Sequence, residues 1–129
     1  MEKLTKEYEK LIEKLPRDSH TLLTQIDVYI FGAMKILELT TEMYILAKEY
    51  LVNSTINYES EYSREIRNLK KDNTQVSIIK DLAKANQNEL RALLYGAEFL
   101  KERAGLLRDI AIERLNTYKK IKSDNVNER

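Results

Sequence analysis

A chain of 129 residues, 43% of them hydrophobic, is long enough to bury one core, and we predict a single helical domain over residues 1–129. The absence of cysteine excludes a disulfide framework, thiol catalysis and cysteine-ligated zinc, and it favours a reducing cytoplasm. The 22 basic and 21 acidic residues nearly balance, so the chain has neither the basic excess of a dedicated DNA-binding protein nor the acidity of a DNA mimic.

The first predicted element is a short amphipathic helix over residues 4–15, because its apolar residues recur at helical spacing. They are Leu4, Tyr8, Leu11, Ile12 and Leu15. The charged start of the chain is followed by no apolar run, so we expect no signal peptide. Pro16 ends this helix, and Asp18, Ser19 and Thr21 are candidate N-caps for the next one.

The second predicted helix runs over residues 21–70. From Leu22 to Val52, 20 of 31 residues are apolar or tyrosine and lie almost all round the helix, which is typical of a central or oligomerised helix. Charged residues interrupt every stretch of membrane-spanning length, so we expect no membrane span. These are Asp27, Lys35, Glu38, Glu42 and Lys48. The polar residues 53–57 compete for backbone hydrogen bonds and mark a candidate kink.

The third predicted helix covers residues 74–122, after a turn that offers Asp72, Asn73 or Thr74 as its cap. From Val76 onward it carries a seven-residue repeat in which twelve of fourteen core positions are apolar. Four of these positions are alanine, at residues 83, 97, 104 and 111, and small residues let two backbones approach closely. Residues 123–129 are polar, and we expect them to fray.

The two long helices have similar lengths of about 48 residues, roughly 70 Å at 1.5 Å per residue, so a short turn makes them an antiparallel hairpin. The predicted fold is therefore all-α: a coiled-coil-like hairpin with an alanine-rich seam and a short N-terminal helix, completed by oligomerisation. A turn centred on residues 72–73 makes the numbers of paired residues sum to about 145. The pairs are Ile79 with Ile66, Leu93 with Val52, Leu100 with Ile45, and Ala111 with Met34. Asn86 is expected to form a polar layer near Tyr58 and Glu59.

Further apolar residues lie outside this seam, and one partner helix cannot cover both faces of the third helix. We therefore predict an interface for a second copy or a partner protein on these faces. Its residues are Tyr95, Phe99 and Leu106, with Tyr29, Phe31 and Tyr44 from the second helix. A kinked second helix that folds back over this face is the alternative.

No pattern of catalytic, cofactor-binding or metal-ligating residues is visible, so we expect no enzyme, no cofactor and no metal. His20 is the only histidine, and no Glu-x-x-His motif or glycine-rich phosphate loop accompanies it. Basic residues crowd the hairpin tip near Tyr58 and Tyr62, where they could grip a nucleic-acid backbone. They are Arg64, Arg67, Lys70, Lys71, Lys80 and Lys84. Acidic residues share the tip, which favours a mixed, solvated helix end.

Residues 73–121 resemble a loose family of small helical phage and prophage proteins. The resemblance rests on Asn73-Thr74-Gln75-Val76, on Ile79 to Ala83, and on the stretch from Ala97 to Arg108 with Ile110, where Leu100-Lys101 and Leu107-Arg108 recur. Such proteins are often encoded beside recombination and single-strand-binding genes, and the family implies no catalytic residues. The resemblance implies a host-cytoplasmic accessory protein that acts by protein contact on DNA replication, recombination or defence machinery. Inhibition of a host defence nuclease, as by an anti-CRISPR protein, and nucleic-acid binding by the tip are the alternatives.

Overall fold

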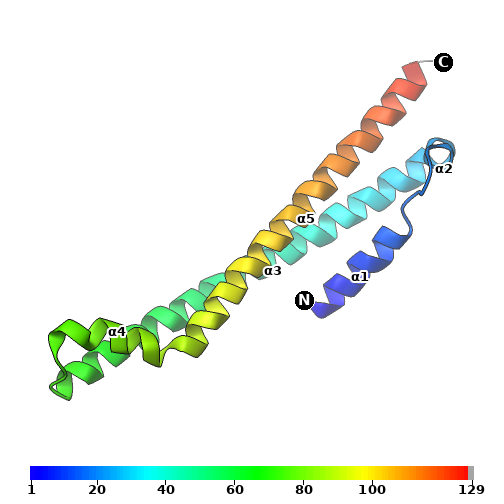
Figure 1. The fold of residues 1–129 in the computed structure, drawn as a ribbon. Helices are drawn as coiled ribbons and strands as arrows, with labels where there is room; N and C mark the ends of the chain where they lie inside the picture. Colours follow the sequence, from blue (N-terminus) through cyan, green and yellow to red (C-terminus); the bar gives the residue numbers. More distant parts are fainter. Residues whose placement is uncertain (128–129) are drawn as a thin grey trace. The chain divides into compact units, whose positions relative to one another are not determined.

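The computed structural model describes residues 1–127, and every regular element within this range is an α-helix (Figure 1). The long helix α3 packs against α5, which confirms the predicted helical hairpin with a short N-terminal helix. The bounds are α1 (Glu2–Glu13), α2 (Ser19–Thr24), α3 (Ile26–Lys71), α4 (Val76–Asn86) and α5 (Asn88–Asn127).

The chain divides into two compact units. The first unit joins Met1–Leu46 to the chain from Glu102 onward, so it holds α1, α2, the start of α3 and most of the length of α5. The second unit is Ala47–Lys101, which contains the rest of α3, α4 and the start of α5. Met1 belongs to the first unit, and the turn between α3 and α4 belongs to the second.

The alanines of the heptad pattern are buried on α4 and α5, as predicted, although Val76 and Leu93 of the same pattern are 85% and 52% exposed. The four alanines are at most 3% exposed. They are Ala83, Ala97, Ala104 and Ala111. A second series of small residues, which the sequence reasoning did not identify, recurs every seven residues on α3 and is at most 9% exposed. It consists of Ala33, Thr40, Ala47 and Ser54. Small side chains on both long helices allow their backbones to approach closely.

The predicted register of the hairpin is wrong by about one helical turn. In the first unit, Thr41 bonds Arg108 and Asp27 pairs with Lys122, and the residue numbers of each pair sum to 149 rather than 145. Val52 and Leu93, which were expected to meet in the seam, are instead more than half exposed. A shift of four residues is close to one turn of 3.6 residues, so it leaves the same faces in contact. This is why the buried alanines were identified correctly while their partners were not.

The predicted helix over residues 21–70 is divided near its start and continuous where a kink was expected. Asp18 caps α2, where its Oδ1 accepts a 2.7 Å hydrogen bond from the Thr21 amide, and this bond lowers the pKa of Asp18. Gln25 then leaves helical geometry before α3 begins. Residues 53–57 stay helical. There, the Thr55 hydroxyl donates to the carbonyl of Leu51 at 2.8 Å within its own helix, and so does not interrupt it.

The turn after α3 is closed by its own backbone. Asn73 has a positive φ of 59°, and the amides of Asn73 and Thr74 donate to the carbonyls of Lys70 and Leu69. These two bonds form a Schellman motif with asparagine in the left-handed position. The predicted caps Asp72, Asn73 and Thr74 therefore terminate α3, while α4 takes Gln75 as its N-cap.

The predicted helix over residues 74–122 is interrupted at Gln87, which separates α4 from α5. Asn86 does not form the expected layer near Tyr58. Its side-chain amide donates to Glu65 at 2.7 Å, and the adjacent polar residues compete with helical backbone bonds. At the other end, α5 continues to Asn127, beyond the predicted end at residue 122. Residues 128–129 of the predicted frayed tail lie outside the described residues.

Candidate protein-contact surfaces

The outer face of α5 carries a row of large apolar side chains that nothing in the described structure covers. Tyr95, Phe99, Leu106 and Ile110 are 59%, 65%, 63% and 47% exposed. Successive members are four, seven and four residues apart, so the geometry of this one continuous helix places them on one face. We call these four residues the α5 stripe. The sequence-predicted residues Tyr95, Phe99 and Leu106 all belong to it.

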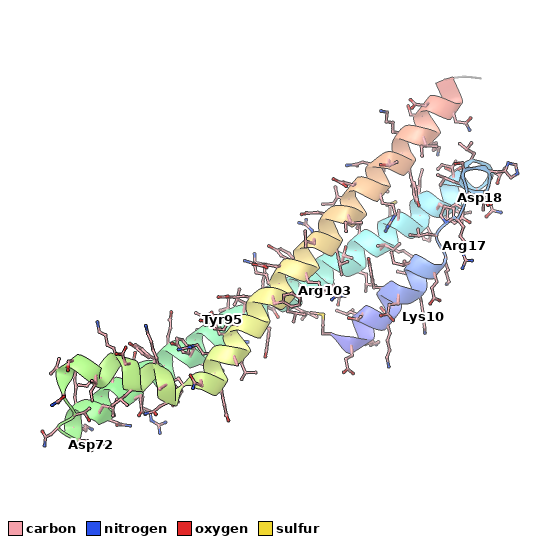
Figure 2. The ribbon with its side chains drawn as sticks, viewed as in Figure 1. Lys10, Arg17, Asp18, Asp72, Tyr95 and Arg103 are labelled. Atoms are coloured by element: carbon pink, nitrogen blue, oxygen red, sulfur yellow. The ribbon has the colours of Figure 1, made fainter. Side chains whose placement is uncertain are left out.

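A row of carboxylates borders the α5 stripe along one edge. Its members are all exposed and repeat the same spacing of four, seven and four, each three residues after a stripe residue. They are Glu98, Glu102, Asp109 and Glu113. Figure 2 labels Tyr95 and Arg103 on this helix. Like charges four residues apart destabilise a helix, so two such pairs on α5 are unfavourable for the isolated chain.

The aromatic residues of α3 that were predicted with this interface do not share one environment. Phe31 is 59% exposed, and the Lys35 ammonium lies 4.6 Å from its ring centroid. The ring of Tyr44 is half-buried beside Gly105, with the Arg108 guanidinium 5.9 Å from its centroid. Tyr29 is also half-buried and lies close enough to Tyr118 to influence its pKa. Thus Phe31 is available to a partner, whereas Tyr29 and Tyr44 face α5.

Polar contacts join α3 to α5 in the first unit. Arg108 Nε donates to Thr41 Oγ1 at 3.2 Å, and Lys122 forms an ion pair with Asp27. The ion pair is solvent-exposed, so we expect it to contribute at most about 1 kcal/mol. Burial raises the pKa of Tyr118, while the charge of Arg114 opposes this shift. Arg114 Nη1 is buried without a hydrogen-bond partner in the described part of the chain.

A shallow groove of about 380 Å³ lies beside these contacts in the first unit. Its lining is apolar apart from one carboxylate and one hydroxyl. The lining residues are Met34, Leu37, Glu38, Thr41 and Leu115. The sequence reasoning did not identify this groove, because its walls come from two helices whose register it placed one turn away.

The basic residues of the hairpin tip lie in the second unit, around the turn marked by Asp72 in Figure 2. All six are exposed: Arg64, Arg67, Lys70, Lys71, Lys80 and Lys84. Arg64 pairs with Glu61 at 3.6 Å on the same helix. Tyr58 and Tyr62 stack on each other with centroids 6.0 Å apart, and both are half-buried. The stacking covers at most one face of each ring and so reduces the aromatic surface that could be presented to nucleic-acid bases.

Within the described residues, no three histidine or acidic side chains are grouped closely enough to hold a metal ion. His20 lies exposed in α2. No helix among the described residues is both long and apolar enough to cross a membrane.

Comparisons with protein-family models, with curated proteins and with solved structures give no match to this chain.

Proposed function

We propose that this protein is a non-catalytic accessory protein that acts by protein–protein contact. The observation that supports this most directly is the α5 stripe, in which two aromatic and two aliphatic side chains are 47–65% exposed. A fully buried aromatic side chain removes roughly 150–250 Å² from solvent, so the four residues together leave several hundred Å² of apolar surface exposed. The largest apolar patch on a monomeric protein reaches several hundred Å² and is often functional.

The resemblance of residues 73–121 to small phage and prophage proteins suggests the setting. On that basis we propose that the target belongs to DNA replication, recombination or defence machinery in the host cytoplasm. Inhibition of a defence nuclease is a narrower form of the same proposal. Self-association through the same surfaces is its simplest form, and the mass of the purified chain separates self-association from binding to another protein.

A pull-down from host lysate, run with and without nuclease and read by mass spectrometry, tests the proposal. We expect one dominant protein that survives nuclease treatment and is lost when the bait carries Phe99→Ser with Leu106→Ser, because these substitutions remove half of the α5 stripe. Val28→Ser with Val76→Ser is the matched control, since both valines are exposed but lie outside the stripe, on α3 and α4.

Retention of the same protein by the control bait and its loss from the stripe variant would support protein contact through α5. Equal recovery with all three baits would place the contact outside the α5 stripe, and the absence of any enriched protein would contradict the proposed function. Circular dichroism on each bait confirms that helical content is unchanged, so that loss of binding is not loss of fold.

Nucleic-acid binding at the hairpin tip is the second candidate, favoured by the exposure of all six basic residues. It requires binding to a single-stranded oligonucleotide that weakens steeply with salt, with a slope that falls in Arg64→Ala with Arg67→Ala. In the pull-down, this function would give a set of proteins that disappears on nuclease treatment.

A further inference from the structure

We propose that the α5 stripe binds an amphipathic helix of a partner protein whose apolar face is edged by lysine or arginine. This inference rests on the proposed function and adds the chemistry of the partner to it. Three properties of α5 support it: an uncovered apolar row, a parallel carboxylate row, and the spacing that the two rows share.

The shared spacing gives the shape of the ligand. Intervals of four, seven and four residues repeat every eleven residues, or about 3.67 residues per turn, so the row stays on one face of a nearly straight helix and another helix can pack lengthwise on it. From Tyr95 to Ile110 the row spans fifteen residues, or about 22 Å of helix. A helix of four to five turns covers this length. Amphipathic helices that bind in grooves contact their partners through apolar residues at intervals of about three, four and seven residues.

The carboxylate row gives the charge of the ligand. Glu98 and Glu102 are four residues apart, as are Asp109 and Glu113, and both pairs repel along the free helix. A cationic side chain placed between the members of a pair would convert this repulsion into attraction. Because the row lies at the rim of the stripe rather than in its centre, these charges would steer the partner and set its register.

A second copy of α5 satisfies this pattern poorly. Two copies that pair antiparallel through the stripe bring the same edge of each helix together, so the acidic row of one faces the acidic row of the other. Two copies that pair in parallel bring opposite edges together. Between Glu98 and Ile110, Arg103 is the only basic residue on that opposite edge. A partner with a continuous basic edge therefore fits the surface better than self-association does.

The test uses a synthetic helical peptide of two eleven-residue repeats, about 22 residues, with leucine on its apolar face and lysine along one edge. The matched probe has glutamate in place of each lysine. Binding to the full-length chain is measured by fluorescence anisotropy at two salt concentrations. We expect the lysine peptide to bind at least tenfold more tightly than the glutamate peptide at low salt, with the difference shrinking as salt screens the charges.

Two variants of the protein assign this binding to the α5 stripe. Glu98→Lys with Glu102→Lys should weaken binding of the lysine peptide roughly tenfold, because two attractive charge pairs at the rim of the stripe become repulsive. Phe99→Ser should weaken binding of both peptides, because it removes the central aromatic contact. The control is Glu2→Lys with Glu9→Lys on α1, which makes the same change of net charge far from the stripe in sequence.

Equal binding of the two peptides, or equal weakening by the α1 control, would overturn the proposal. So would a purified chain with twice the 15.2 kDa mass that becomes monomeric on Phe99→Ser, because a second copy would then occupy the stripe. The two proposals can fail separately. The pull-down could recover a nuclease-resistant target equally well with the Phe99→Ser, Leu106→Ser bait. That result would contradict this inference, but the proposed protein contact would then use another surface.

Discussion

Helix α5 has two apolar faces that differ in the size of their side chains and in their burial. The buried face contains Ala97, Ala104 and Ala111, which are at most 3% exposed. The opposite face contains Tyr95, Phe99, Leu106 and Ile110, which are about half to two-thirds exposed. A monomer that maximised apolar burial would place the larger side chains inside, because burial of each stabilises by roughly 1.5–3 kcal/mol. The small alanines are inside instead, together with Leu115 at 8% exposure, and their size is consistent with close packing of α5 on α3.

This difference separates the roles of the two faces. The alanine face sets the distance between α3 and α5, and α3 contributes Ala33, Thr40, Ala47 and Ser54 at the same seven-residue interval. The large side chains are not needed for this packing. Their exposure is then unexplained by folding and consistent with contact to another molecule, which is the basis of the proposed function.

The largest expected effect comes from enlarging the buried face. Ala104→Leu inserts three heavy atoms where two helices pack closely, and overpacking of this kind costs about 1–3 kcal/mol. Urea denaturation should show this loss in the free energy of unfolding, and the melting temperature should fall by several degrees.

The same substitution on the exposed face of the same helix sharpens the comparison. Ala92 is exposed, so Ala92→Leu should change the free energy of unfolding by no more than about 0.5 kcal/mol. Equal destabilisation by the two leucines would show that the alanine face is not closely packed, and the difference between the two faces would then be one of composition only.

The sequence predicted which face of α5 is buried but not what lies opposite each residue. Heptad spacing depends only on local helical geometry, so Ala83, Ala97, Ala104 and Ala111 could be identified without any knowledge of the partner helix. The register depends on where the turn begins and ends. The end of α3 is set by the left-handed backbone conformation of Asn73. Counting residues along the sequence does not reveal this conformation.

The interruptions of the helices were also harder to predict than their faces. Residues 53–57 and residues 86–88 are similarly polar, yet only the second group breaks a helix. In the first group, Ser54 is 9% exposed within the seam and Thr55 bonds its own helix. In the second, Asn86 is exposed and donates to Glu65. Burial of Ser54, the local bond of Thr55 and the tertiary bond of Asn86 separate the two cases, and none of them follows from polarity alone.

A smaller change in the free energy of unfolding is expected from replacing the two glycines of α5. Gly105 lies on the covered side of the helix, and Gly96 lies on the open side. Replacing helical glycine by alanine stabilises by about 1 kcal/mol through helix propensity. A Cβ at Gly96 would meet open space among the described residues, whereas one at Gly105 would lie 3.4 Å from Tyr44 Cε2 and 3.7 Å from Cδ2. We expect both Gly→Ala variants to raise the free energy of unfolding, with Gly105→Ala gaining at least as much. A loss at Gly105 alone would show that the added methyl group does not fit beside the Tyr44 ring.

The smallest expected effect is on the pH dependence of stability, at Tyr118 of the seam. Burial raises the pKa of Tyr118 above its ordinary value near 10. The unfolded chain therefore loses this proton at lower pH than the folded chain, so the contribution to stability is complete below pH 10 and is lost as pH rises through the folded pKa. In Tyr118→Phe, the free energy of unfolding measured with urea should therefore fall less steeply as the pH rises above 10. The matched control, Tyr95→Phe, removes one phenol from the exposed stripe instead. If the two variants change the alkaline decline equally, burial in the seam does not distinguish Tyr118, and the contrast between the faces of α5 does not extend to proton binding.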